Sequence, residues 1–131
     1  MIFIDSNIPM YLVGAPHPNK DAARAAIERS INRGERLVTS AEVMQEILRR
    51  YVAIKRPNAI QPALDVLLGV VAEVFSIEPV DVTNARDVLM ARTRMSARDA
   101  LHVAVMKRRK IERVMSFDAG FDVVAWLERV Y

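Results

Sequence analysis

Short apolar runs alternate with longer segments of helical periodicity along the whole chain. Four apolar runs have the length and the β-branched or aromatic content of buried strands, at about 2–4, 37–40, 74–77 and 113–117. Between them, apolar residues recur at helical spacing and turn residues mark the ends, which predicts helices. The expected helices cover about 8–13, 20–33, 41–56, 59–71, from 83 or 84 to 92, and 96–106. The tail VVAWLERVY fits either a short helix or an edge strand.

This alternation predicts the fold class. Strands separated by helices imply crossover connections and a mainly parallel sheet with helices on both faces. At 131 residues, the chain has the length of one domain, spanning 1–131. We therefore expect an α/β protein, a single-domain three-layer α/β/α sandwich with a mainly parallel sheet of four or five strands.

Composition narrows the class of protein further. The chain has no cysteine, which excludes disulfide frameworks and zinc–thiolate sites. No apolar stretch has the length of a membrane span, so we expect a cytoplasmic protein that makes no membrane contact.

The basic residues are clustered, although the net charge is only +3. They occur in three groups: Arg49, Arg50, Lys55 and Arg56; Arg92, Arg94 and Arg98; and Lys107, Arg108, Arg109, Lys110 and Arg113. Two interpretations are open at this point. The groups are either solvated cations at helix ends, where the helix dipole favours them, or a patch that binds phosphates.

Two of the expected strands end in an aspartate. Asp5 follows the first buried run and Asp118 follows the last one. Ligands and catalytic groups collect at the carboxyl edge of a parallel sheet, and both carboxylates would lie there. Each also has a structural interpretation, Asp5 as a helix cap and Asp118 as a turn former next to Gly120, with Asp122 in the same turn.

Further acids come from two predicted helices near the same edge. Glu46 lies within two turns of the strand at 37–40, Glu42 lies one turn earlier, and Asp99 lies in the first turn of the helix capped by Ser96. Asp99 alone fits a capping box. Glu46 alone fits an ion pair with Arg49 or Arg50 on the helix surface.

Taken together, these acids predict a metal site. Carboxylates crowded together repel one another, so such a cluster persists when a cation occupies it. Oxygen ligands without cysteine favour Mg²⁺ or Mn²⁺ over zinc. Such a site suits metal-assisted hydrolysis of phosphodiesters, and the basic groups would then hold a nucleic-acid backbone.

The ordered set MIFIDSN, VMQEIL, RDALHVAVM and MSFDAGFD resembles the four acidic motifs of PIN-domain ribonucleases, and most closely the VapC-type toxins of toxin–antitoxin pairs. The resemblance covers essentially the whole chain. It implies that the catalytic and metal-binding acids are Asp5, Glu46, Asp99 and Asp118. Glu46 fits the family's motif better than Glu42, and the choice between them stays open. Secondary positions beside these acids are Asn7, Ser116, Asp122 and Glu42.

The resemblance also implies a set of partners. These are an RNA substrate cleaved endonucleolytically, Mg²⁺ or Mn²⁺ as cofactor, a second copy in a homodimer, and a VapB-like antitoxin. The RNA-binding residues would be Arg49, Arg50, Arg98, Lys107 and Arg108. Residues 10–12 or 64–71 could offer an apolar surface to an antitoxin, but a core role is favoured for both.

Two other functions stay open. The chain could be a housekeeping PIN nuclease of RNA processing without an antitoxin, or a PIN-like module that binds RNA or protein without cutting it. The intact set of acids argues against the second, because a binding module gains nothing from mutual repulsion. His102 shares a helix face with Asp99 and could be a general base, but a buried histidine that is hydrogen-bonded to a neighbour is the favoured interpretation.

Overall fold

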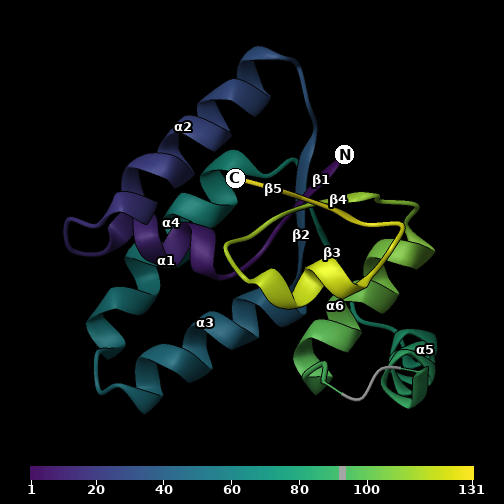
Figure 1. The fold of residues 1–131 in the computed structure, drawn as a ribbon. Coiled ribbons are helices and arrows are strands. Elements are labelled where there is room, and N and C mark those ends of the chain that lie inside the picture. Colours follow the sequence, from purple (N-terminus) through teal and green to yellow (C-terminus); the bar gives the residue numbers. More distant parts are fainter. Residues whose placement is uncertain (92–93) are drawn as a thin grey trace.

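The computed structural model describes residues 1–91 and 94–131 (Figure 1). Its centre is a five-stranded sheet in the order β3-β2-β1-β4-β5, and all four neighbouring pairs are parallel. The strands are β1 (Ile2–Ile4), β2 (Leu37–Ser40), β3 (Glu73–Phe75), β4 (Arg113–Met115) and β5 (Glu128–Val130). Because β1 is central and pairs with both β2 and β4, the residues that follow these three strands meet at one edge.

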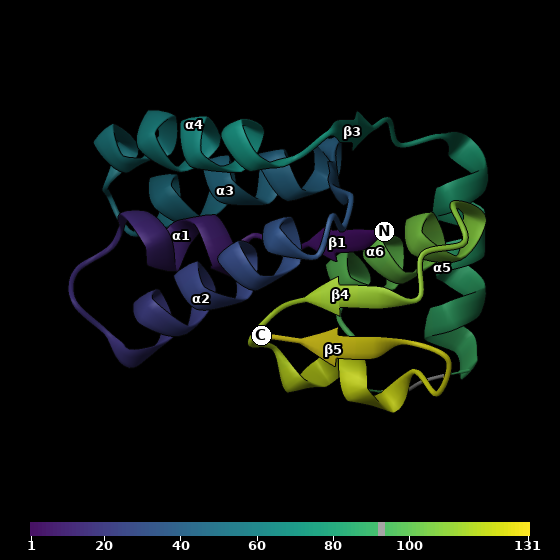
Figure 2. The same cartoon turned by 90° about the horizontal axis from the view of Figure 1, so that it is seen from above.

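In the part of the chain that the structure describes, six α-helices flank the sheet. They are α1 (Asn7–Val13), α2 (Pro18–Asn32), α3 (Ala41–Ala53), α4 (Ile60–Val70), α5 (Pro79–Ala91) and α6 (Ala97–Arg108). Two short 3₁₀ helices, η1 (Pro57–Ala59) and η2 (Ala119–Val123), complete the described elements. Helices α1 to α4 gather on one side of the sheet and α5 with α6 on the other (Figure 2). The parallel sheet between helical layers confirms the predicted fold class.

The core explains why these runs form strands. All three residues of β1 and all four of β2 are buried, as expected for central strands covered on both faces. Helix α6 also contributes buried residues to this core, including Val103 and Met106. Its small residues Ala100 and Ala104 pack against Ala85 of α5. The elements that carry the acidic residues are therefore anchored in a rigid core.

Several element boundaries differ from the sequence-based ranges. Helix α2 begins at Pro18 rather than near residue 20, because the His17 side chain caps it by accepting a hydrogen bond from Asn19 N–H, 3.0 Å away. Helix α3 ends at Ala53, where the chain turns through Lys55 in the left-handed region (φ 59°) before Pro57. Strand β3 covers Glu73–Phe75 rather than 74–77, and β4 ends at Met115.

Helix α5 begins four residues earlier than the lower sequence estimate of 83. Pro79 occupies its first position, where a missing N–H costs nothing, and the Asp81 carboxylate accepts a hydrogen bond from Glu78 N–H at 2.8 Å. The far end of this helix was expected near Arg92, a residue of the second basic group that lies outside the described residues.

The ambiguous tail forms an edge strand and not a helix. The 3₁₀ helix η2 ends at Val123, the first residue of this tail, and Glu128–Val130 form β5, which pairs with β4 at the edge of the sheet. Among the described residues, no helix has the length and apolar character needed to cross a membrane.

A candidate metal centre at the carboxyl edge of the sheet

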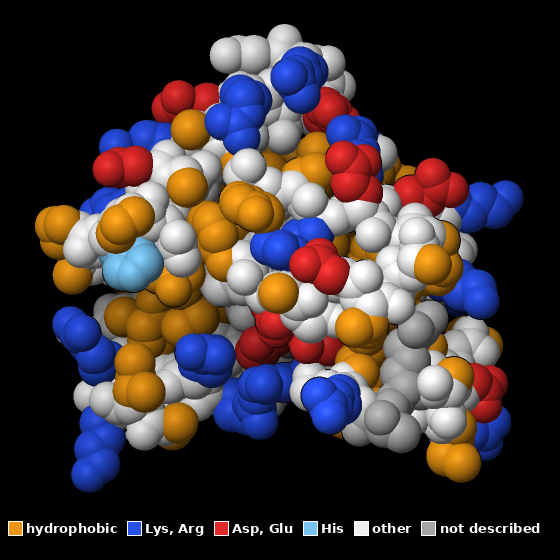
Figure 3. Space-filling view, viewed as in Figure 1, with side chains coloured by type: hydrophobic (Ala, Val, Ile, Leu, Met, Phe, Trp, Pro, Cys, Tyr) orange, Lys and Arg blue, Asp and Glu red, His pale blue; other side chains and the backbone are white. Residues whose placement is uncertain are grey.

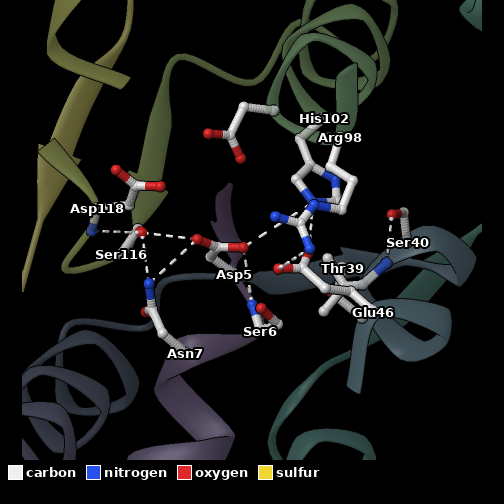
Figure 4. Close-up of polar contacts among 12 residues, drawn as sticks. Asp5, Ser6, Asn7, Thr39, Ser40, Glu46, Arg98, His102, Ser116 and Asp118 are labelled. Carbon is white, nitrogen blue, oxygen red and sulfur yellow. Dashed lines mark hydrogen bonds and ion pairs between the residues drawn. The ribbon is translucent and has the colours of Figure 1, made fainter. Parts of the chain in front are cut away.

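Asp5 is held in place at the end of β1 by hydrogen bonds from several donors. Its side chain is buried, with 4% of the residue exposed. Oδ1 accepts from Ser6 N–H at 2.8 Å, and Oδ2 accepts from the Ser116 hydroxyl at 2.7 Å and from Asn7 Nδ2 at 3.3 Å (Figure 4). Asn7 Nδ2 also donates to Ser116 Oγ at 3.0 Å. The secondary residues Asn7 and Ser116 therefore lie beside Asp5 because β1 and β4 are neighbours.

Glu46 reaches the same edge from α3. Strand β2 runs directly into this helix, which Ser40 caps by accepting from Val43 N–H at 3.4 Å. Glu46 is 6% exposed and turns inward, away from the surface position that an ion pair with Arg49 or Arg50 would require. Its Oε2 lies 3.2 Å from His102 Nε2 and its Oε1 lies 3.9 Å from Arg98 Nη1. The geometry favours Glu46 over the half-buried Glu42 as the acid of this helix at the site.

Asp99 and Asp118 complete the cluster from α6 and from the loop after β4. The capping interpretation of Asp99 holds for its backbone, since Asp99 N–H donates to Ser96 Oγ at 3.1 Å. Asp118 is also the turn former that its sequence allowed, because Oδ1 accepts from Gly120 N–H at 2.8 Å. A Cβ atom added at Gly120 would lie 3.0 Å from Asp118 Oδ1 and 3.6 Å from Asp99 Oδ2. Both carboxylates thus flank Gly120, whose missing side chain leaves room for them.

The charges of these residues act on one another. Burial, together with the negative charges of Asp118 and Asp5, raises the pKa of Asp99 to about 6. Burial likewise raises the pKa of Asp5, more than its contacts with His102 and Ser116 lower it. For Glu46, burial acts in the same direction but is outweighed by the His102 hydrogen bond and charge, so its pKa is lowered. Burial lowers the pKa of His102, but Glu46 and Asp5 outweigh it and the net direction is upward.

The residues present fit a hard divalent cation. Carboxylate oxygens of Asp5 and Glu46 and a ring nitrogen of His102 all lie within 4.8 Å of one another. Carboxylate oxygens dominate this donor set, and the pKa of Asp99 near 6 reflects unfavourable negative charge that a cation would offset. We therefore describe the cluster as a candidate metal centre.

Comparison with known proteins identifies the family. The family model for the PIN domain matches residues 2–127. The chain belongs to the PIN domain family. Ribonuclease VapC13 of Mycobacterium tuberculosis is 58% identical to this PIN domain over 130 residues, which cover 99% of each chain.

Solved structures agree on the fold of this PIN domain. The crystal structure of VapC20 of Mycobacterium tuberculosis, a toxin that cleaves the sarcin-ricin loop, superposes with a TM-score of 0.77 at 22% identity, covering 98% of both chains. VapBC2 of Rickettsia felis, solved with a DNA fragment from its promoter, has a TM-score of 0.74 at 16% identity, covering 98% of this chain and 97% of that one.

The basic residues of this PIN domain occupy different environments. Figure 3 shows acidic side chains gathered in a hollow, with Lys and Arg side chains around it. Arg98 borders the centre with 34% of its side chain exposed, and Arg49, Arg50 and Lys107 are exposed. Arg108 is held by the Asp81 carboxylate, with Nε 2.6 Å from Oδ1 and Nη2 2.8 Å from Oδ2.

Asp122 lies outside the cluster. It is an exposed residue that accepts hydrogen bonds from Arg129 Nε at 2.9 Å and from Arg129 Nη2 at 3.0 Å. Arg129 in turn donates to the main-chain oxygen of Ser116 at 3.4 Å. Asp122 is thus connected to the centre only indirectly, through Arg129 and the Ser116 backbone.

The contact between His102 and Glu46 is the feature of the site that sequence reasoning did not assign. The one available signal was the spacing of His102 three residues after Asp99, which places both on one face of α6. That spacing does not identify Glu46 as the partner, because Glu46 belongs to a helix 56 positions earlier in the chain.

Proposed function

We propose that this PIN domain is a VapC-type endoribonuclease that hydrolyses RNA phosphodiester bonds and depends on Mg²⁺ or Mn²⁺. The observation that carries the proposal is the convergence of Asp5, Glu46, Asp99 and Asp118 from four separate elements on one edge of the sheet. The relatives that match along nearly the whole chain are named VapC ribonucleases, and their names support the same activity.

The chain's own residues prepare this site for a polyanionic substrate. A divalent cation bound there supplies activation of a water molecule and offsets charge on the phosphate. Ser6, Asn7 and Ser116 fix the carboxylate of Asp5 with hydrogen bonds, so that its oxygens need little reorganisation when the cation binds. Arg98 places positive charge 3.9 Å from Glu46 at the edge of the centre, where a phosphate would approach.

We further propose the biological setting that the family resemblance implies. The protein acts in the cytoplasm as the toxin of a pair, as a homodimer restrained by a VapB-like antitoxin. The VapBC2 structure, one chain of which has the same fold, supports an antitoxin partner. The names of the curated relatives favour this setting over a housekeeping nuclease without an antitoxin.

Removal of divalent cations tests the activity directly. Purified protein incubated with total cellular RNA and Mn²⁺ or Mg²⁺ is expected to produce discrete fragments, which disappear with EDTA and return when Mn²⁺ is added in excess. The Asp5→Asn variant controls for contaminating nucleases, because they would copurify with it unchanged. Equal fragmentation by wild type and variant contradicts the proposal, as does fragmentation that persists in EDTA.

The exposed arginines at the end of α3 are proposed to contact the RNA backbone. Reversing Arg49 and Arg50 to glutamate is expected to raise KM for RNA and to reduce the salt dependence of binding by about one unit of log–log slope per lost phosphate contact. Arg24→Glu combined with Arg33→Glu, an equal charge change at two exposed positions in and directly after α2, serves as the control. Equal effects of the two changes on KM would indicate attraction by net charge only and contradict a specific contact.

A further inference from the structure

His102 is buried in the middle of the candidate metal centre. None of its surface is exposed, and its ring packs against Phe3 of β1 with 5.6 Å between ring centroids. Nε2 lies 3.2 Å from Glu46 Oε2 and 3.9 Å from Asp5 Oδ1 (Figure 4). The shorter distance is a hydrogen bond, while the longer one is outside hydrogen-bonding range.

The two ring nitrogens have very different surroundings. Nδ1 is buried and has no hydrogen-bond partner among residues 1–91 and 94–131. Nε2 is therefore the nitrogen that contacts the acids. Because it lies 3.2 Å from a carboxylate oxygen, which can only accept a hydrogen bond, Nε2 carries a proton. A nitrogen that donates its N–H to Glu46 has no free lone pair with which to bind a cation.

Glu46 needs such a partner more than Asp5 does. Asp5 is short and receives hydrogen bonds from Ser6, Asn7 and Ser116. Glu46 has one more rotatable bond. Besides His102, the Ser6 side chain also hydrogen-bonds to it with a smaller effect on its pKa, and Arg98 lies 3.9 Å away with a partly exposed side chain. A flexible glutamate side chain costs more entropy to fix in one rotamer, so a rigid, buried donor has a correspondingly larger effect on its position.

We propose that His102 is a positioning residue: its Nε2–H holds the Glu46 carboxylate in the orientation that binds the divalent cation, and it acts neither as a metal ligand nor as a general base. This inference rests on the proposed metal dependence of the centre. Hydrogen bonds to ligating groups typically change metal affinity by about 10- to 100-fold. The effect of His102 should therefore appear in Mn²⁺ binding itself, without any need for substrate.

Two substitutions of His102 test whether the side chain at this position must reach Glu46 with an N–H donor. In His102→Gln, the longer amide can still place an N–H near Glu46, whereas in His102→Asn it is too short to do so. We expect His102→Asn to weaken Mn²⁺ binding, measured by isothermal titration calorimetry, by about 10-fold or more, and His102→Gln to remain within about threefold of wild type. His17→Gln is the matched control, since His17 caps α2 and is the other histidine of the chain.

A double-mutant cycle tests whether His102 acts through Glu46. In the Glu46→Ala background, the substitution His102→Asn is expected to cause no further loss of Mn²⁺ affinity, because the side chain that it positions is gone. Additive losses in the cycle overturn the proposal. Unchanged affinity in the single variant His102→Asn overturns it as well.

Electron spin-echo spectroscopy of the Mn²⁺-loaded wild type shows whether His102 binds the metal, and it needs no variant. The expected spectrum lacks strong coupling to an imidazole ¹⁴N nucleus, and its presence overturns the proposal. This measurement and the affinity of His102→Gln remain informative even if His102→Asn does not fold, which circular dichroism would reveal.

The two proposals fail in distinguishable ways. A wild type that binds no Mn²⁺ refutes the metal dependence in the proposed function. A wild type that binds Mn²⁺ equally well with and without His102 refutes the positioning role alone.

Discussion

Replacing Asp99 with asparagine is expected to lower RNA cleavage by about 10³-fold, because the proposed metal centre would lose a carboxylate and with it several kcal/mol of transition-state stabilisation. The same substitution should raise the thermal stability of the metal-free protein. Burial and the negative charges of Asp118 and Asp5 raise the pKa of Asp99 to about 6 from the ordinary 3.8. Asparagine keeps the shape and removes the cost of a buried, crowded charge, and a gain of about 1 kcal/mol would correspond to roughly 4 °C in Tm.

The pH dependence of this effect has a definite sign. A carboxyl whose pKa is higher in the folded state binds its proton more tightly there, so its contribution to stability is full below pH 3.8 and is lost as the pH rises through about 6. In EDTA, wild-type stability should therefore decline over this window relative to Asp99→Asn. Thermal unfolding of both proteins between pH 4 and pH 8 measures the difference.

The exposed Asp65 of α4 offers a matched control for Asp99. Asp65→Asn makes the same chemical change at a position where the carboxylate contacts Gln61 on the surface. It should leave both cleavage and the pH dependence of Tm close to wild type. An Asp99→Asn variant that still cuts RNA would contradict its place among the catalytic acids, and an unchanged Tm in EDTA would contradict the charge repulsion.

The second large effect is expected at the ion pair between Asp81 and Arg108, which takes no part in the proposed metal centre. Asp81→Asn should lower the free energy of unfolding by about 3 kcal/mol, because it leaves the Arg108 guanidinium without its charged partner in a partly buried position. Asp81 is fully buried, and its carboxylate also accepts the N–H of Glu78 at the start of α5. Urea unfolding followed by circular dichroism measures the loss.

Acid should reproduce this loss in the wild type. Burial raises the pKa of Asp81, but the hydrogen bonds and charge of Arg108 outweigh it, so the pKa lies below the ordinary 3.8. The pair thus contributes fully above pH 3.8, and its contribution disappears as the pH falls through the lower, folded-state pKa. Asp81→Asn should lack this part of the acid dependence.

Asp87 supplies the control within the same helix. Asp87 pairs with Arg86, but both side chains are 68% exposed, so Asp87→Asn should change stability by less than about 1 kcal/mol. In addition, Arg108→Leu combined with Asp81→Asn should recover part of the loss, because it removes the unpaired charge. A destabilisation equal to that of Asp87→Asn would show that the buried pair adds nothing.

The local hydrophobic pattern predicted most helices and strands, but it did not predict where some of them begin. The sequence predicts that helix α5 starts at Thr83 or Asn84, because both residue types are typical helix caps. Its true start depends on Asp81, which is buried by its pairing with Arg108 of α6, 27 positions later. A partner at that distance is set by the packing of α5 on α6, and no window of neighbouring residues reveals it.

The sequence by itself placed two aspartates at the carboxyl edge of a parallel sheet. Apolar runs at 2–4 and 113–117 specify buried strands, and an aspartate after each must lie at the carboxyl end of its strand. Only the tertiary structure decided which strands are neighbours, that Glu46 rather than Glu42 turns inward, and that His102 faces Glu46 across two helices. The physical reason is that strand order and helix rotation depend on the packing of the whole core, whereas the end of a strand is marked locally by the first polar residue after an apolar run.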